Sequence, residues 1–171
     1  KTSQTDPAGD ETTFGYDLDG EQTSSVAADG HVAGGNPAVF TTVMVYDGDG
    51  EVTSVTDQLG DTTSFGYDAD GNKTSVTDAT GLTSTSVFGV DDELVSTTNP
   101  DGTSASYAYD GDGRVLSVFD GGGDTTGYGY DVLGRRTTVT DPWGAVLTSA
   151  YDLAGRLVPV TRPDGGVTTN A

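Results

Sequence analysis

One residue pattern recurs every 21 residues along this 171-residue chain and constrains its fold more than any other feature. An aromatic residue keeps the interval at Tyr46, Tyr67, Phe88, Tyr109, Tyr130 and Tyr151, and a glycine keeps it at Gly60, Gly81, Gly102, Gly123, Gly144 and Gly165. An earlier unit contains Tyr16. About nine extra residues near 31–39 separate it from the other units. Because self-similarity at a fixed period marks a repeat architecture, we expect residues 1–171 to form a single array of about seven units.

The unit 61–81 indicates what each repeat folds into. Two runs rich in Thr, Val and aromatic residues alternate with clusters of Asp and Gly, which is the pattern of β-hairpins. No window has the i, i+3, i+4 spacing of an amphipathic helix. The sequence therefore predicts an all-β fold, a repeat array of antiparallel β-hairpins in one continuous curled sheet. Turns are expected at 68–71, 110–113, 131–134 and 152–155, and further reversals at 57–60, 78–81, 120–123 and 141–144.

Alternation of side chains predicts which face of the sheet is apolar. If Tyr67 pairs with Asn72 across a four-residue loop, Phe65 lies opposite Thr74. This pairing gives one face Tyr67, Phe65, Thr74 and Val76, and the other Gly66, Ser64, Lys73 and Ser75. The unit ending at Gly123 divides in the same way, into Tyr107, Tyr109, Leu116 and Val118 against Ala108, Ser106, Val115 and Ser117. We expect Tyr67, Tyr109, Tyr130 and Tyr151 to be mostly buried, together with Val76, Val118 and Val139.

The number of strands predicts that this apolar face needs a cover. Seven units imply about fourteen strands, and open twisted sheets rarely exceed about ten strands without curling. Edge strands near 12–16 and 146–151 are expected to leave backbone groups unpaired. We therefore expect the array to be a section of a longer chain or assembly. Its partners would be copies of itself, in a homo-oligomer or filament, or flanking parts of the same polypeptide.

Composition excludes several classes of function. The chain holds 27 acidic and 7 basic residues, a net charge of −20 at pH 7. Such a polyanion repels nucleic acid and anionic membrane surfaces, and no stretch approaches the roughly 20 apolar residues of a membrane-spanning helix. The absence of cysteine excludes disulfides, thiol catalysis and thiolate metal sites.

The one candidate ligand site is for calcium. Pairs of aspartates two residues apart, each followed by glycine, resemble the opening of a Ca²⁺-binding loop, where oxygen ligands converge on a hard cation. The candidate ligands are Asp47, Asp49, Asp68, Asp70, Asp110 and Asp112. The full twelve-residue loop with a late glutamate is absent. The alternative is plain turn chemistry, in which each Asp bonds its own backbone, and no other cofactor is expected.

Nothing in the sequence predicts an enzyme. A Tyr hydroxyl beside an Asp carboxylate can relay protons, but here the pair recurs at successive hairpin ends, which favours a structural role. His31 is the single histidine and lies in the inserted segment, without a G-x-S-x-G motif to accompany it. We found no phosphate-binding or dinucleotide-binding fingerprint. We therefore expect no catalytic site.

The stretch 130–144, YDVLGRRTTVTDPWG, resembles the YD repeat, Y-D-x-x-G-R-x-x-x-V-T-D-P-x-G. The segments 109–114 and 151–156 match its first half. This is the repeat of Rhs proteins, teneurins and the cocoon components of insecticidal Tc toxins. The resemblance implies a long β-sheet that spirals into a hollow shell, often around a C-terminal toxin, in an extracellular or cell-surface protein. Where the repeat has arginine, the earlier units have Glu21, Glu51, Asn72 and Glu93, and the unit at Phe88-Gly89 lacks the YD pair.

These observations favour a non-enzymatic, secreted structural protein, a YD-repeat β-ribbon that forms a shell or a self-assembling filament wall. One alternative is a wall section of a toxin-encapsulating cocoon of the Rhs or Tc type. The other is a cell-surface adhesin or glycan-binding repeat module, which exposed aromatic residues such as Trp143 would favour.

Overall fold

The computed structural model describes residues 2–28, 40–158, 160–161 and 167–168, so His31 and the inserted segment 31–39 lie outside the described residues. Within these ranges the regular elements are β-strands, and no helix is long and apolar enough to cross a membrane. The strands are β1 (Ser3–Thr5), β2 (Glu11–Tyr16), β3 (Gln22–Val26), β4 (Thr41–Tyr46), β5 (Val52–Thr56), β6 (Thr62–Tyr67), β7 (Lys73–Thr77), β8 (Thr83–Phe88), β9 (Leu94–Thr98), β10 (Ser104–Tyr109), β11 (Val115–Phe119), β12 (Thr125–Tyr130), β13 (Arg136–Thr140), β14 (Val146–Thr148), β15 (Ala150–Tyr151), β16 (Leu157–Val158), β17 (Val160–Thr161) and β18 (Val167–Thr168).

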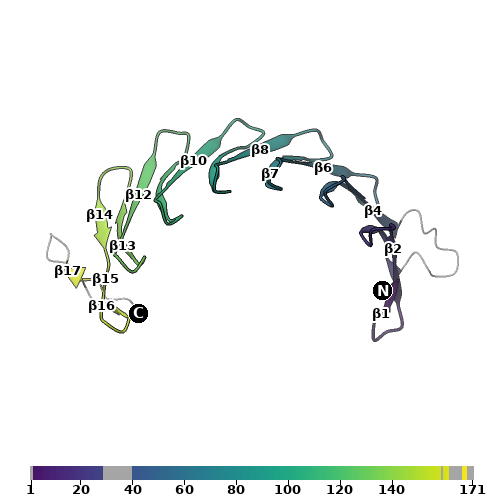
Figure 1. Cartoon of the computed structure of the whole chain (residues 1–171), viewed down its shortest axis with the longest axis horizontal. Helices are drawn as coiled ribbons and strands as arrows, with labels where there is room; N and C mark the ends of the chain where they lie inside the picture. The colour runs from purple at the N-terminus through teal and green to yellow at the C-terminus, as the bar shows by residue number, and fades with distance from the viewer. Residues whose placement is uncertain (1, 29–39, 159, 162–166, 169–171) are drawn as a thin grey trace. The chain divides into compact units, whose positions relative to one another are not determined.

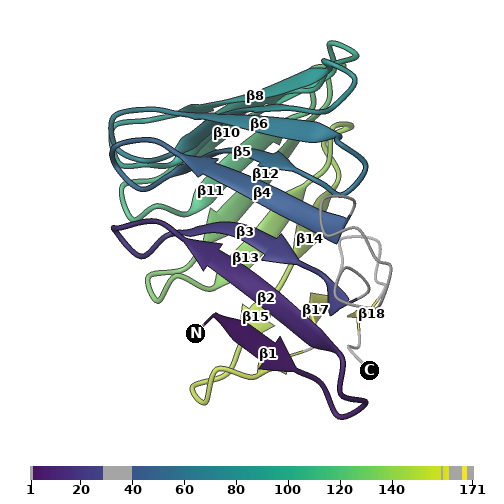
Figure 2. The same ribbon diagram turned by 90° about the vertical axis from the view of Figure 1, so that its right-hand side faces the viewer.

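The chain divides into two units, Lys1–Ser86 (unit 1) and Val87–Ala171 (unit 2), which follow the same strand plan. In unit 1, each strand from β1 to β7 pairs antiparallel with the next strand in the sequence, and Figure 2 shows β1, β2 and β3 side by side. In unit 2, β9 to β14 pair in the same way, and β15 forms a separate pair with β16 (Figure 1). The strands β17 and β18 form another separate pair. The predicted all-β array of antiparallel hairpins is confirmed.

The outermost strand of unit 1 differs from the expected one. An edge strand was expected near 12–16, but β2 there is paired on both sides, with β1 and with β3. Residues 3–5 form the extra strand β1 because a turn at 6–10 reverses the chain before β2. The prediction near 146–151 is closer, since β14 is the last strand of the meander.

The turns lie where the Asp and Gly clusters predicted them. At the 68–71 turn, the amide of Asp68 donates to the carbonyl of Asn72 over 3.0 Å, and the amide of Gly71 donates back to the carbonyl of Asp68 over 3.2 Å. Gly71 has a φ of 87°, a left-handed conformation that glycine adopts without a steric penalty. The expected turns at 110–113, 131–134, 152–155, 57–60, 78–81, 120–123 and 141–144 are confirmed as well.

The predicted strand register is wrong by two residues at Phe65 and by one residue at Tyr67. Phe65 lies opposite Val76, not Thr74, and Tyr67 lies opposite Lys73, not Asn72. The register shifts between Gly66 and Tyr67, so β7 carries one extra residue that faces no partner, which is a β-bulge. The same shift occurs just before Tyr16, Tyr46, Tyr109 and Tyr130, and it therefore belongs to the repeat.

The bulge also exchanges two residues between the faces. The ammonium of Lys73 lies 4.3 Å from the centre of the Phe65 ring, so Lys73 belongs to the apolar face, contrary to the prediction. Thr74 moves to the opposite face, where a Cβ built on Gly66 would lie 3.8 Å from its hydroxyl and 2.6 Å from that of Ser75. Val115 likewise joins the apolar face, where it lines a hollow with Tyr107, while Leu116 takes the extra position.

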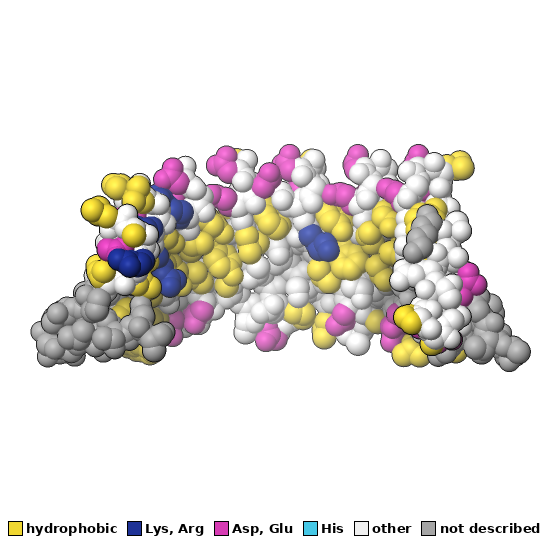
Figure 3. Space-filling model, turned by 90° about the horizontal axis from the view of Figure 1, so that it is seen from below, with side chains coloured by type: hydrophobic (Ala, Val, Ile, Leu, Met, Phe, Trp, Pro, Cys, Tyr) yellow, Lys and Arg dark blue, Asp and Glu magenta, His cyan; other side chains and the backbone are white. Residues whose placement is uncertain are grey.

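No described side chain is fully buried, so the expected burial of the tyrosines is wrong for this chain by itself. The residues concerned, Tyr67, Tyr109, Tyr130, Tyr151, Val76, Val118 and Val139, are half-buried. Each unit is a single-layer sheet, and a side chain on such a sheet is covered by its neighbours only from the sides. Figure 3 shows one face of the molecule, with hydrophobic side chains gathered over the strands and acidic side chains along the edges where the turns lie.

One turn in unit 2 departs from the repeat at two positions. Gly89 stands where the turns that follow Tyr16, Tyr46, Tyr67, Tyr109, Tyr130 and Tyr151 have aspartate, and Asp92 stands where they have glycine. The turn still forms, because the amide of Asp92 donates to the carbonyl of Gly89 over 3.2 Å. Asp92 must then adopt a φ of 59°, a left-handed conformation that is unfavourable for most side chains.

We expect Asp92→Gly to stabilise the protein by about 0.5 kcal/mol, because glycine removes the penalty of the left-handed conformation. The matched control is Gly102→Ala, at a φ of 84° with open space around the added Cβ, which should destabilise by about 1 kcal/mol. Urea denaturation of both variants measures the two effects. A loss of stability in Asp92→Gly would mean that the aspartate side chain is worth more to this turn than its backbone strain.

Candidate functional site: turn carboxylates and the apolar face

Each turn-opening aspartate is bonded to its own turn. Oδ1 of Asp68 accepts the amides of Asp70 over 3.1 Å and of Asn72 over 2.9 Å. The hydrogen bond from the Asn72 backbone is the largest of the influences that lower the pKa of the Asp68 carboxyl. The aspartates that accept backbone amides in this way are Asp6, Asp17, Asp47, Asp57, Asp68, Asp78, Asp110, Asp120, Asp131, Asp141 and Asp152.

The six candidate calcium ligands lie in three separate turns, Asp47, Asp49, Asp68 and Asp70 in unit 1 and Asp110 and Asp112 in unit 2. In the described part of the chain, no three carboxylate or histidine side chains gather in a way that could hold a metal ion. The carboxylates of Asp110 and Asp112 both bind the guanidinium of Arg114, over 2.7 and 2.6 Å. Calcium binding stays a hypothesis. The two turns of unit 1 are the better candidates, because the ion pairs with arginine occur at the turns of unit 2.

If calcium binds those two turns, added Ca²⁺ raises the melting temperature and a chelator lowers it, by mass action on the folded state. Asp49→Asn and Asp70→Asn should then abolish the shift, while Asp112→Asn should leave it in place. Differential scanning calorimetry from micromolar to millimolar Ca²⁺ decides this. Superimposable curves would leave these aspartates with the turn role alone.

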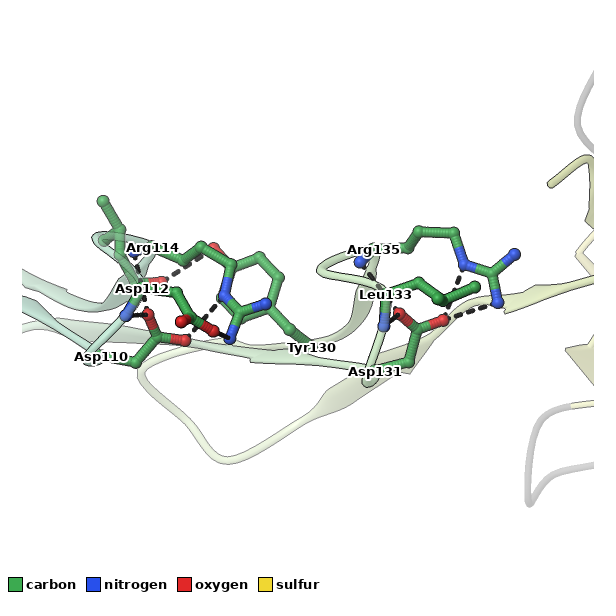
Figure 4. Close-up of polar contacts among 8 residues, drawn as sticks. Asp110, Asp112, Arg114, Tyr130, Asp131, Leu133 and Arg135 are labelled. Carbon is green, nitrogen blue, oxygen red and sulfur yellow. Dashed lines mark hydrogen bonds and ion pairs between the residues drawn. The ribbon is translucent and has the colours of Figure 1, made fainter.

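Arginine closes three turns of unit 2 with a repeated ion pair. Arg114, Arg135 and Arg156 each lie four residues after the turn-opening aspartate and contact its carboxylate over 2.7 Å. Figure 4 shows Arg114 and Arg135 folded over their turns in this way. The guanidinium of Arg114 also lies 5.3 Å from the centre of the Tyr130 ring, and that of Arg135 lies 4.6 Å from the centre of the Tyr151 ring. Arg114 and Arg135 therefore each join their own turn to the repeat tyrosine of the following hairpin.

In unit 1 the same position carries glutamate at two turns, Glu21 and Glu51, and asparagine at the third, Asn72. The Glu51 side chain reaches the following turn, where its Oε1 lies 2.9 Å from the point a Cβ on Gly71 would occupy. Partial desolvation, followed by the charges of Asp47 and Asp49, raises the pKa of the Glu51 carboxyl. Desolvation and then the charge of Glu51 raise the pKa of the Tyr67 hydroxyl. The sequence showed that arginine is replaced here, but not that glutamate would lie among like charges.

We expect Glu51→Arg to raise the melting temperature by a few degrees, because the new guanidinium pairs with Asp47 as Arg135 pairs with Asp131. The same change should lower the pKa of Tyr67, since the neighbouring negative charge is removed. Thermal unfolding and ultraviolet titration of the tyrosines measure the two effects. Glu51→Gln, which removes the charge without adding a partner, should give a smaller rise. An arginine variant that melts below the glutamine variant would contradict the pairing.

Tyrosine hydroxyls connect neighbouring hairpins, a feature that the sequence analysis missed. The Tyr67 hydroxyl donates to the backbone carbonyl of Val52 over 3.0 Å, and that of Tyr130 donates to the carbonyl of Val115 over 2.8 Å. Equivalent bonds join Tyr46 to Gln22, Tyr109 to Leu94 and Tyr151 to Arg136. Each acceptor is the first residue of the strand after the preceding turn, so the constant spacing of tyrosine and bulge was the available signal. Each of these hydroxyls donates to a backbone carbonyl, which gives the tyrosine of the Tyr-Asp pair a structural contact between hairpins.

The apolar face of unit 2 contains a shallow hollow of about 300 Å³. It is lined by Tyr107, Val115, Val118, Tyr128, Tyr130 and Arg136. The Arg136 guanidinium lies 5.7 Å from the centre of the Tyr128 ring. Aromatic and aliphatic side chains with one cation can bind an apolar group.

Solved structures share this fold. A crystal structure of TcdB2-TccC3-TEV matches with a TM-score of 0.69 and 16% identity, over 92% of this chain and 9% of that one. A crystal structure of TcdB2-TccC3 and the structure of a Photorhabdus luminescens Tc holotoxin pore each match with a TM-score of 0.66 and 16% identity, over 87% of this chain and 9% of theirs. This chain thus spans about a tenth of the length of these relatives, and at that identity the likeness concerns the fold.

Sequence comparison identifies the family. No curated protein matches the chain. The RHS Repeat family, in contrast, matches residues 2–32, 46–83, 90–118 and 109–146, which together make up more than half of the sequence. The YD pattern, the 21-residue period and the hairpin fold agree with that match. The chain belongs to the RHS repeat family.

Proposed function

We propose that this chain is a non-enzymatic structural protein, whose hairpins form a section of the wall of an Rhs/Tc-type shell. The observation that carries this proposal is the single-layer sheet. Within each unit one face is apolar and aromatic, and no described residue is buried. A wall that encloses other material needs a broad surface and strong lateral connections. The bulged hairpins and the tyrosine hydroxyl bonds supply both.

The same proposal includes the partners and the location. Flanking parts of the same polypeptide, or copies of the chain, would cover the apolar face and remove it from water. The net charge of −20 keeps isolated chains apart through mutual repulsion. An extracellular or cell-surface location fits the RHS repeat family and is part of the proposal. The family resemblance also implies a toxin as the enclosed material.

Sedimentation velocity tests the need for a cover. When the salt concentration rises from about 0.05 M to about 1 M, the screening length falls from above 10 Å to about 3 Å, and the chains should associate through their apolar faces. A closed wall gives complexes of finite size, whereas a filament continues to grow with protein concentration. A monomer at every salt concentration that binds no apolar dye would contradict the proposal.

A second candidate function is a surface-binding module, such as an adhesin or a glycan-binding protein. The observation that favours it is Trp143, whose side chain is 84% exposed in the 141–144 turn. Its indole ring would stack on a ligand from outside the sheet. This candidate predicts that the protein binds to a glycan array, that Trp143→Ala loses this binding, and that the bound glycan changes Trp143 fluorescence in solution. The wall proposal predicts none of these results.

A further inference from the structure

Acidic side chains lie at the rim of the apolar face of unit 1. The rim is the row of turns at 17–21, 47–51 and 68–72. The register places Phe65 opposite Val76 and Met44 opposite Val55 on this face. Unit 1 contains 15 acidic residues and two basic ones, a net charge of −13, whereas unit 2 contains 12 and five, a net charge of −7. In the described part of unit 1 the single basic side chain is Lys73, whose ammonium lies 4.3 Å from the centre of the Phe65 ring and 5.8 Å from that of the Tyr67 ring.

Unit 2 shows which group fits the rim position of this repeat. There Arg114 lies between the turn carboxylate of Asp110, at 2.7 Å, and the ring of Tyr130, at 5.3 Å. The rim position therefore places a cation against both a carboxylate and the edge of the apolar face. In unit 1 the corresponding residues are Glu51, Asp47 and Tyr67, where the carboxylate and the ring are kept and the cation is replaced by another carboxylate.

The Glu51 side chain is also directed toward further negative charge. Its Oε1 lies at the 68–71 turn, which carries Asp68 and Asp70, and Glu21 reaches the 47–50 turn in the same way. No basic side chain within the described residues of unit 1 lies close enough to either glutamate to form an ion pair. The rim of unit 1 therefore combines half-buried glutamate carboxylates, adjacent tyrosine rings and an open apolar surface.

We propose that the apolar face of unit 1 docks a polypeptide segment in which lysine or arginine side chains stand next to apolar ones. The apolar side chains would lie on Met44, Val55 and Phe65, and the cations would lie at the rim near Glu21 and Glu51. This inference rests on the proposed wall function and adds the chemistry of the covering polypeptide. A second copy of this chain fits less well, since its own net charge of −20 opposes the rim.

Binding of short synthetic peptides to the 171-residue protein tests this. Three peptides share the same Leu and Phe residues and carry Lys, Ser or Glu at the positions between them. Isothermal titration calorimetry should show that the Lys peptide binds most tightly, the Ser peptide less tightly and the Glu peptide most weakly. The preference for Lys should weaken as salt rises from about 0.05 M to about 0.5 M, because rim charges are screened.

Matched variants distinguish the effect of a charge at the rim from the effect of the overall net charge on peptide binding. Glu51→Arg should weaken binding of the Lys peptide about fivefold, the size expected for loss of an exposed ion pair. Asp124→Arg makes the same change in net charge on an exposed turn of unit 2 and should leave that affinity unchanged. Phe65→Ser should abolish binding of all three peptides, with circular dichroism confirming that the protein stays folded. Equal losses in Glu51→Arg and Asp124→Arg would overturn the proposal.

The peptide series also distinguishes this inference from the wall function. If the Lys, Ser and Glu peptides bind equally and all need Phe65, the face takes a cover without regard to charge, and only the cationic preference fails. If no peptide binds while the apolar dye does, docking of an extended segment is wrong although the face is open. If neither dye nor peptide binds, the wall function fails as well.

Discussion

Replacing Tyr130 with alanine is expected to lower the free energy of unfolding by about 3 kcal/mol, among the largest effects for a single residue of this sheet. The ring lines the hollow of unit 2 and lies 5.3 Å from the guanidinium of Arg114. Its hydroxyl donates to the carbonyl of Val115 over 2.8 Å. Alanine removes the packing, the cation–π contact and the hydrogen bond together, and with them the connection between two hairpins.

Tyr130→Phe isolates the hydroxyl. It keeps the ring and the contact with Arg114 but leaves the Val115 carbonyl without that donor, so we expect a loss of about 1 kcal/mol. Urea denaturation of the three proteins gives both differences. Phenylalanine and alanine variants of equal stability would show that the hydroxyl bond, and not the ring, holds the hairpins together. A fully stable phenylalanine variant would show that the bond to Val115 contributes nothing.

Stability should rise as the pH falls from 7 toward about 5 and then decline steeply below about 4. The rise comes from Glu21 and Glu51, whose pKa values are raised by desolvation and by neighbouring carboxylates. A carboxyl with a raised pKa gains its proton in the folded protein first, so protonation favours the folded state. The net charge of −20 also falls in magnitude over this range, which reduces self-repulsion.

The decline comes from the turn aspartates. Hydrogen bonds from backbone amides, and from the side chains of Asn72, Thr80, Arg114, Arg135 and Arg156, hold the pKa values of Asp68, Asp78, Asp110, Asp131 and Asp152 below their ordinary value. Their contribution to stability is complete above the unfolded pKa of about 3.9 and is lost as the pH falls through the lower folded values.

Melting temperatures measured by circular dichroism from about pH 2 to about pH 7 test the two effects. This range covers the titration of both the glutamates and the turn aspartates. The double variant Glu21→Gln and Glu51→Gln should flatten the rise and keep the acid decline. Asp131→Asn, which keeps the shape of the side chain but not its charge, should weaken the decline. A melting temperature that falls steadily from pH 7 downward would contradict the role of the two glutamates.

The turns were predictable from the sequence because their chemistry is local. An aspartate five residues before a strand and a glycine three residues after that aspartate fix the 68–71 turn without any long-range contact. The strand register was not predictable in the same way. A bulge at Thr74 depends on how β6 and β7 twist against each other, and it moved Lys73 onto the face assigned to Phe65.

The burial of the apolar side chains was also not predictable from the alternation of residues along the strands. Alternation correctly assigned Tyr67, Phe65 and Val76 to one apolar face, but it could not tell whether this chain supplies a second layer to cover that face. The rim shows a similar division. The sequence showed glutamate in place of arginine at Glu51, whereas its position beside Tyr67 and the next turn depends on the spacing of neighbouring hairpins.

Fluorescence of Nile red, an uncharged apolar dye, tests the central claim that each unit is a single-layer sheet with an open apolar face. At low salt, where a charge of −20 keeps chains apart, the folded protein should bind the dye with a large increase in emission. The emission should fall in Phe65→Ser and Tyr130→Ser. A folded chain that gives no increase would have its apolar face already covered, and the account of an open wall section would be wrong.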